Sequence, residues 1–230
     1  MGRIKRFLAC SAAVLLLCAQ SCSLSIYAKP YRKGATQTKQ IALTFDDGPS
    51  IRNTEEILAI LKEYGIRATF FVIGENAAAD PDRIRMIHKA GHEIGNHTYT
   101  HAYISKISGD TLREEIRKTE DVLKEITGER PTVFRPPGGY YDEASLAILE
   151  EMGYQSILWS LDTKDWCMPK SDTIASKIEE NAVGGDIILF HDLNDKRLPT
   201  PEALKRILPY LKENGYEFVT ISEMIENEAG

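Results

Sequence analysis

The feature that most constrains the fold is a regular alternation of two sequence patterns between residues 41 and 226. Short runs rich in β-branched and aromatic residues, such as Ile41 to Phe45, are each followed by a longer segment with helical periodicity. Seven such pairs predict seven βα units, and repeated βα units predict a parallel sheet. Glycines at the ends of several predicted helices support the helix boundaries, because helices often end on a left-handed glycine. These glycines are Gly65, Gly91, Gly128, Gly153 and Gly215.

The predicted strands are 41–45, 68–73, 92–95, 132–134, 154–160, 186–190 and 217–219. The predicted helices are 53–64, 81–90, 110–127, 142–152, 171–181, 201–214 and 222–226. An open doubly wound sheet is the main alternative, but no Gly-x-Gly-x-x-Gly follows the first strand. We therefore expect an α/β protein with a distorted parallel (β/α) barrel of about seven strands.

The first 28 residues differ from the rest of the chain. Three basic residues precede an apolar run from Phe7 to Ala19, and small and polar residues follow it. This order is typical of a signal peptide, and the run is shorter than the roughly 20 residues of a membrane-spanning helix. We expect an extracytoplasmic protein, secreted or attached to the cell envelope, with membrane contact only through this segment. Cleavage after Ala28 or Ser21, lipidation at Cys22 and retention as an anchor all stay open.

Cleavage after Ala28 would leave residues 29–39 as a polar linker and residues 40–230 as a single domain. Only Cys167 of the four cysteines would remain, so the domain could form no internal disulfide and would depend on its core. Residues 29–230 hold 25 Lys/Arg and 34 Asp/Glu, a formal charge of −9. This balance argues against nucleic acid or an anionic polymer as the main ligand.

Two adjacent carboxylates, Asp46 and Asp47, follow the first predicted strand and precede Gly48 and Pro49. Neighbouring carboxylates repel each other, so the pair suits a site in which one binds a cation and the other stays free as a base. Asp, Gly and Pro also form turns, so this segment alone leaves a plain turn as the alternative.

Other polar residues follow later predicted strands. They are His97 and His101 after the third, Arg135 after the fourth, Asp162 and Asp165 after the fifth, and His191 at the end of the sixth. In a parallel barrel the C-terminal strand ends form one face, on which active sites are built. The spacing of His97 and His101 would place both imidazoles on one side of a helical turn, and one carboxylate would complete an open metal triad. Singly, each residue has a structural interpretation, but together they predict one site.

Five segments, in this order, resemble the five motifs of the NodB-homology polysaccharide deacetylases. They are Thr44-Phe45-Asp46-Asp47-Gly48, His97-Thr98-Tyr99-Thr100-His101, Arg135-Pro136-Pro137, Asp162-Thr163-Lys164-Asp165-Trp166 and Leu189-Phe190-His191. The resemblance covers about residues 40 to 225. It implies a distorted (β/α) barrel that removes N-acetyl groups from sugar polymers with a divalent metal, often zinc.

The resemblance also implies roles for individual residues. Asp47, His97 and His101 would bind the metal. Asp46 would be the catalytic base, held ionised and oriented by Arg135, and His191 would be the catalytic acid, paired with Asp165. Trp166 and Leu189 would form the walls of a pocket for the acetyl methyl group, while Asp162 could simply cap its loop.

One position departs from many relatives, which have Tyr where this chain has Gly138. The backbone N–H that would help to hold the oxyanion is retained, whereas a role for a Tyr ring is in doubt. Tyr140 or Tyr141 could fill that space.

The sequence thus predicts a monomeric deacetylase that acts on an N-acetylated polysaccharide or oligosaccharide and binds Zn²⁺, with Co²⁺, Mn²⁺ and Ni²⁺ as alternatives. Peptidoglycan N-acetylglucosamine is the expected target. A chitooligosaccharide or exopolysaccharide deacetylase, an O-acetyl esterase and a non-catalytic carbohydrate-binding protein are the alternatives. A glycosidase that uses Asp46 and Asp47 is weaker still, because neighbours on one strand point to opposite faces.

Overall fold

A computed structural model describes residues 29–193 and 197–229, so the predicted export signal lies outside the described residues. The strands form one sheet around the central strand β1 (Gln40–Asp46). The others are β2 (Thr69–Val72), β3 (Glu93–Asn96), β4 (Val133–Phe134), β5 (Gln155–Ser156), β6 (Leu161–Asp162), β7 (Ile187–His191) and β8 (Glu217–Phe218). Their order is β5-β4-β3-β2-β1-β7-β6, β8 lies beside the start of β1, and every pair is parallel. The predicted distorted (β/α) barrel is therefore confirmed.

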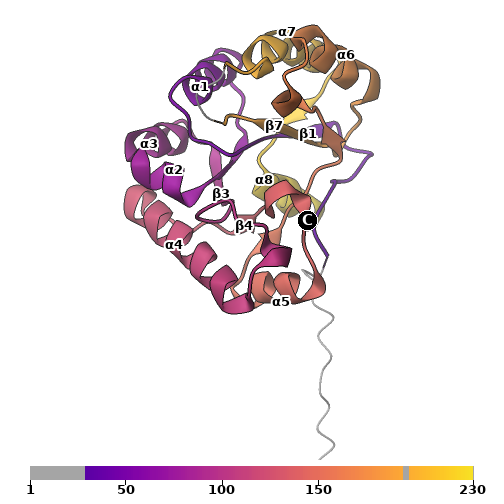
Figure 1. The fold of residues 1–230 in the computed structure, drawn as a ribbon. Helices are drawn as coiled ribbons and strands as arrows, with labels where there is room; N and C mark the ends of the chain where they lie inside the picture. Colours follow the sequence, from indigo (N-terminus) through magenta and orange to yellow (C-terminus); the bar gives the residue numbers. More distant parts are fainter. Residues whose placement is uncertain (1–28, 194–196, 230) are drawn as a thin grey trace, which may run out of the picture.

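Helices surround this curled sheet, with α6 and α7 at one end and α4 and α5 at the other (Figure 1). The helices are α1 (Asn53–Tyr64), α2 (Gly74–Ala79), α3 (Pro81–Lys89), α4 (Gly109–Thr127), α5 (Glu143–Glu151), α6 (Ser171–Asn181), α7 (Thr200–Glu213) and α8 (Ile221–Ala229). The sequence did not predict α2. It is followed by Asp80, whose side chain accepts a hydrogen bond from Arg83 N and so caps α3, which Pro81 begins.

The fifth predicted strand, 154–160, was wrong as a single element, because the chain changes partners within it. Ile157 N donates to Phe134 O on β4, whereas Ser160 N donates to Ile187 O on β7. Between them, Leu158 N donates to Tyr31 O in the N-terminal segment. Only β5 therefore lies within the predicted strand, and β6 begins just after it; these two strands are not paired with each other in the described part of the chain.

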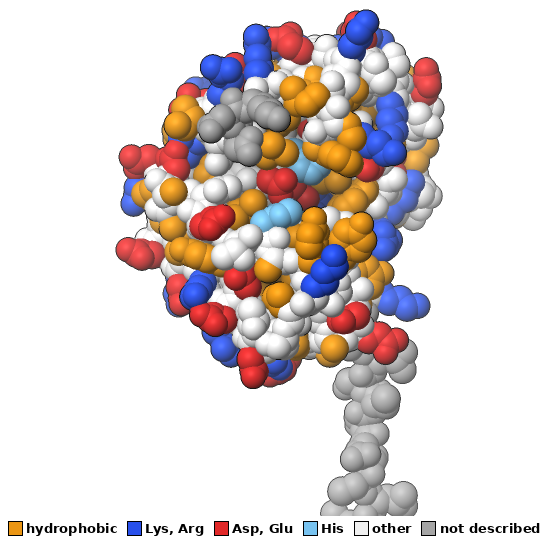
Figure 2. All heavy atoms as spheres, in the orientation of Figure 1, with side chains coloured by type: hydrophobic (Ala, Val, Ile, Leu, Met, Phe, Trp, Pro, Cys, Tyr) orange, Lys and Arg blue, Asp and Glu red, His pale blue; other side chains and the backbone are white. Residues whose placement is uncertain are grey.

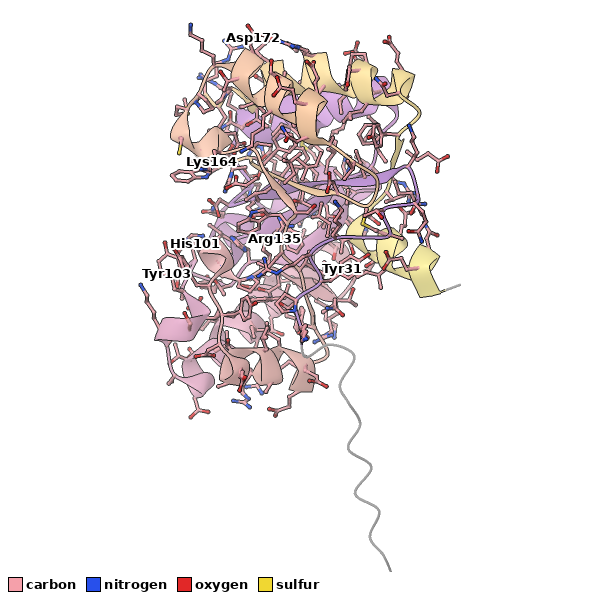
Figure 3. All side chains as sticks on the ribbon, turned by 90° about the vertical axis from the view of Figure 1, so that its right-hand side faces the viewer. Tyr31, His101, Tyr103, Arg135, Lys164 and Asp172 are labelled. Atoms are coloured by element: carbon pink, nitrogen blue, oxygen red, sulfur yellow. The ribbon has the colours of Figure 1, made fainter. Side chains whose placement is uncertain are left out.

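Part of the expected linker, residues 29–39, packs where β5 and β6 separate. Tyr31 forms a parallel bridge with Ile157, and Lys33 forms an antiparallel bridge with Asp186. Lys33 Nζ also lies 2.9 Å from Asp186 Oδ1. Figure 3 shows Tyr31 near the point where this segment reaches the barrel. The domain limits themselves stay a prediction.

The two faces of β1 explain how an apolar strand can end in a buried carboxylate. Ile41, Leu43 and Phe45 point into the main core, where the Phe45 ring stacks on those of Phe70 and Phe190 with centroids 4.9 Å and 5.6 Å away. Because successive side chains alternate between faces, Thr44 and Asp46 point to the other face. Each fully buried side chain of this size stabilises the fold by roughly 1.5–3 kcal/mol, so the core fixes β1 firmly.

Among the described residues no helix has the length and apolar character to cross a membrane.

Candidate active site

The paired carboxylates occupy different positions at the end of β1. Asp46 is its last residue and its side chain is 5 % exposed, whereas Asp47 lies beyond the strand and its side chain is 19 % exposed. Asp47 has φ of 73°, in the left-handed region that non-glycine residues seldom adopt. Its backbone is held there, because Asp47 N donates to Phe71 O and Asn76 Nδ2 donates to Asp47 O. Both neighbours line the same cleft, but Asp46 is the more deeply buried of the two.

His97 and His101 converge as predicted, but the helical explanation of their spacing was wrong. Residues 97–101 form no helix. Thr98 (φ 64°) and His101 (φ 60°) instead adopt left-handed conformations, which fold the segment back and bring the imidazole centroids to 5.1 Å. His97 is almost fully buried, and its Nδ1–H donates to Arg135 O at 2.7 Å. This bond orients the ring so that Nε2 faces Asp47, the arrangement of a histidine ligand.

Asp47, His97 and His101 together form a group suited to a metal ion. Asp47 Oδ1 lies 3.3 Å from His97 Nε2 and 3.2 Å from His101 Nε2, and one ligand atom from each residue falls within 4.8 Å of the others. Oδ1 is buried without a hydrogen bond of good geometry, as expected for an atom that faces a cation. Burial disfavours ionisation of Asp47, but the imidazoles of His101 and His97 outweigh it and hold its pKa well below the usual range. Two imidazoles and one carboxylate are ligands that zinc prefers.

Arg135 is fully buried inside the barrel, where its side chain binds β1 and the loop that follows β5 (Figure 3). Its Nη1 donates to Asp46 Oδ1 at 2.7 Å and to Thr44 Oγ1 at 2.8 Å, and Nη2 donates to Leu158 O at 3.3 Å. The guanidinium carbon also lies 4.1 Å from the centre of the Phe71 ring. Burial lowers the pKa of Arg135, and the charge of Asp46 opposes this effect. Asp46 is therefore held by its Oδ1, and Oδ2 lies toward the histidines, 3.9 Å from His97 Nε2.

His191 ends β7 and is paired with Asp165, as predicted. Its Nδ1–H donates to Asp165 Oδ1 at 2.8 Å, and its backbone N–H donates to Asp165 Oδ2 at 2.8 Å. Thr200 Oγ1 and Trp166 N donate to the same carboxylate. Burial disfavours the imidazolium, but the bond to Asp165 and its charge prevail and raise the pKa of His191 to about 9.

One cleft of about 520 Å³ is lined by the possible metal ligands Asp47, His97 and His101, by Asp46 and by His191. It is also lined by Gly138, Trp166 and Leu189, which the sequence placed in the substrate pocket. Figure 2 shows acidic and histidine side chains at the centre of this face, with hydrophobic side chains around them. Trp166 is 53 % exposed at the rim, and Leu189 is 3 % exposed. Asp162 also lines the cleft, but its Oδ1 accepts a hydrogen bond from Lys164 N, so it caps the loop, as the sequence allowed.

Three features of the site were absent from the prediction. Tyr103 and Trp159 line the cleft, and Tyr103 packs edge-to-face on Tyr140 with centroids 5.6 Å apart. Asp192 is buried beside His191. The sequence shows that Asp192 is adjacent to His191. It gives no signal for Tyr103 or Trp159, because isolated aromatic residues more often belong to a core.

Replacing Asp165 with Asn should lower the pKa of His191 from about 9. The amide carries no charge, so burial would then favour the neutral imidazole. In the parent, the imidazole of His191 binds its proton more tightly in the folded than in the unfolded state, and this difference stabilises the fold. The contribution is fully present below pH 6.5, the ordinary pKa of histidine, and is lost as the pH rises through about 9. NMR titration of the metal-free imidazole measures the change.

The control is Asp162→Asn, because Asp162 lies on the same loop and bonds to Lys164 N rather than to His191. This variant should leave the titration unchanged. An unaltered pKa of His191 in Asp165→Asn would show that Asp165 does not control its protonation.

Comparison with known proteins agrees with this geometry. The polysaccharide deacetylase family matches residues 33–157. A peptidoglycan-N-acetylglucosamine deacetylase of Bacillus cereus is 43 % identical over 189 residues, which are 81 % of this chain and 88 % of the relative. A solved peptidoglycan N-acetylglucosamine deacetylase bound to a substituted benzamide has a TM-score of 0.84 at 39 % identity, over 86 % of this chain and 92 % of that one. A CE4 family pseudoenzyme from Bacillus anthracis has a TM-score of 0.81 at 30 % identity, over 86 % and 69 % of the two chains. The chain therefore belongs to the polysaccharide deacetylase family.

Proposed function

We propose that the protein hydrolyses the N-acetyl group of N-acetylglucosamine in peptidoglycan, outside the cytoplasm and with a bound divalent cation. The observation that carries this proposal is the single cleft in which Asp47, His97 and His101 converge beside Asp46 and His191. An acetamide has a weakly electrophilic carbonyl and a poor leaving group, so its hydrolysis needs a Lewis acid, a base and an acid.

Asp47, His97 and His101 would hold the cation, and zinc is our choice, with Co²⁺, Mn²⁺ and Ni²⁺ as alternatives. A bound cation of this kind polarises a carbonyl oxygen and lowers the pKa of a bound water to about 7. Three protein ligands leave positions for water and substrate. The hydrogen bond from His97 Nδ1–H to Arg135 O supports this role, because it orients the ring with Nε2 toward Asp47.

Asp46 and His191 would move the two protons of the reaction. Asp46 Oδ2 would accept a proton from the attacking water, since Oδ1 is already held by Arg135. His191 Nε2–H would protonate the departing sugar nitrogen, and Asp165 would stabilise the imidazolium through Nδ1–H. The raised pKa of His191, about 9, supplies the protonated form at neutral pH.

The remaining cleft residues would position the acetyl group. Gly138 N–H would donate to the oxyanion as it forms, and Trp166 and Leu189 would enclose the methyl group. The similarity to peptidoglycan deacetylases supports peptidoglycan as the substrate. The complete set of five polar residues supports catalysis over carbohydrate binding alone, which the fold by itself does not decide, since a pseudoenzyme shares it. The protein would act as an exported monomer.

Replacing Asp46 and Asp47 separately tests the division of roles. Asp46→Asn removes the proton acceptor, so acetate release should fall by roughly 10²–10⁴-fold while the metal content is retained. Asp47→Asn should instead reduce the metal content, because a neutral amide is a weaker ligand. Released acetate is measured with peptidoglycan, chitooligosaccharides and acetylated xylan, and bound metal is measured by elemental analysis.

Peptidoglycan should be the best of the three substrates. Removal of the cation by a chelator should abolish acetate release, and added zinc should restore it. Full activity of the metal-free protein would contradict the proposed mechanism, and equal metal loss in both variants would contradict the separate roles of the two carboxylates.

Substitution of Gly138 with Ala should lower acetate release. Gly138 has φ of 65°, and a methyl group there would lie 2.9 Å from the Tyr140 ring and 3.0 Å from Tyr103. Gly128→Ala is the matched control, since Gly128 has φ of 81° but no atom within 4 Å of an added methyl group. Both variants bear backbone strain of about 1–2 kcal/mol, so both should lose a few degrees of melting temperature.

Only Gly138→Ala should impair turnover, because only this change displaces the cleft wall and its N–H donor. Equal turnover in the two glycine variants would exclude Gly138 from the catalytic site.

A further inference from the structure

A third carboxyl group, that of Asp192, lies at the same strand ends, and the proposed mechanism does not use it. Asp192 follows β7 and is 1 % exposed. Its N–H donates to Asp46 O at 3.0 Å, and its Oδ2 accepts a hydrogen bond from Thr54 Oγ1 at 2.5 Å. Its Oδ1 is buried and has no hydrogen-bond partner among the described residues. The side chain is thus enclosed between β7, the end of β1 and the start of α1.

The carboxyl group packs directly against Gly48, the residue that follows Asp47. A methyl group on Gly48 would lie only 2.2–2.4 Å from Asp192 Oδ2, Oδ1 and Cγ, so no space separates the two residues. We call residues 47–50 the turn after β1. Thr54 joins this turn to Asp192, because Thr54 Oγ1 also accepts a hydrogen bond from Ser50 N at 2.8 Å. Asp192 therefore contacts the turn directly at Gly48 and, through Thr54, at Ser50.

This turn needs support from both sides, because Asp47 is in a left-handed conformation. From the β2 side, Phe71 O accepts from Asp47 N, and Ile73 N donates to Gly48 O at 3.1 Å. From the β7 side, Asp192 supplies the packing against Gly48. Gly48 is thus held between the two strands that flank β1.

Asp192 supports the turn by its shape and hydrogen bonding. It makes no ion pair within the described residues, and burial raises the pKa of Asp192 to about 7. A buried carboxyl group without a cationic partner is tolerated better when it is neutral. A neutral side chain of the same shape should therefore be able to replace it.

We propose that Asp192 is a positioning residue, which holds Asp47 in its metal-binding geometry by packing against Gly48 from the β7 side. This inference rests on the proposed metal site of Asp47, His97 and His101. Asp192 acts through the backbone of the turn rather than through contact with the cation or the substrate.

Zinc affinity, measured by competition with a chelating dye, tests this role in three variants. Asp192→Ala should weaken zinc binding by about tenfold or more, the usual effect of removing a group that orients a ligand. Asp192→Asn keeps the shape and the acceptor for Thr54, so its affinity should stay close to that of the parent. Asp186→Ala is the control, because Asp186 is also buried but lies before the other end of β7, where it binds Ser160 and Lys33.

The control should lower the melting temperature of the metal-free protein without changing zinc affinity. Gly48→Ala is a second variant, which retains the Asp192 residue. Its methyl group should clash with the Asp192 carboxyl group, displace the turn and weaken zinc binding as well. Unchanged zinc affinity in Asp192→Ala, or in Gly48→Ala if the first variant does not fold, would overturn the proposal. An equal loss in Asp186→Ala or in Asp192→Asn would overturn it too. Failure of the parent protein itself to bind zinc would instead refute the proposed metal site.

Discussion

The site depends on the buried ion pair between the guanidinium of Arg135 and the carboxylate of Asp46. The side chain of Arg135 holds Asp46 and Thr44 on β1, and the backbone carbonyl oxygen of Arg135 holds His97 Nδ1. One residue therefore orients both the proposed base and a proposed metal ligand. Removing one partner of a buried ion pair typically costs 3–5 kcal/mol, because the other charge is left unpaired. An intact buried ion pair adds little net stability, because desolvation of both charges offsets their attraction. The main effect of this pair is therefore to fix the orientation of Asp46.

The barrel supplies rigid strand ends, and the loops that follow them supply unusual backbone conformations. The non-glycine residues with positive φ in the described chain are Asp47, Thr98, His101, Lys164 and Met168. Each lies in a loop of this face, and two of them are proposed metal ligands. Such conformations cost free energy and persist only where surrounding contacts enforce them. Hydrogen bonds at these residues provide such contacts: Asp47 N donates to Phe71 O, Thr98 N to Asn96 Oδ1 and Lys164 N to Asp162 Oδ1.

The sequence predicted the parallel barrel and the convergence of polar residues at its C-terminal strand ends, because strand periodicity and the rule for strand ends are local and topological. It did not predict the division of 154–160, which arises when Leu158 N pairs with Tyr31, a residue distant in sequence. It also gave the wrong reason for the approach of His97 and His101, since no spacing rule reports that Thr98 is left-handed. The sequence carried no indication of a role for Asp192, because its proposed positioning role depends on contact with Gly48, which only the fold creates.

The two adjacent carboxylates are proposed to have different roles, because Arg135 holds Asp46 and leaves Asp47 to the cation. A crystal structure of the zinc-loaded protein, with the ion located by its anomalous scattering, tests this division. We expect zinc bound by Asp47, His97 and His101 at about 2.0–2.2 Å, with Asp46 still bound to Arg135 and outside the ligand set. Zinc bound by Asp46, or an Asp46 released from Arg135, would contradict it.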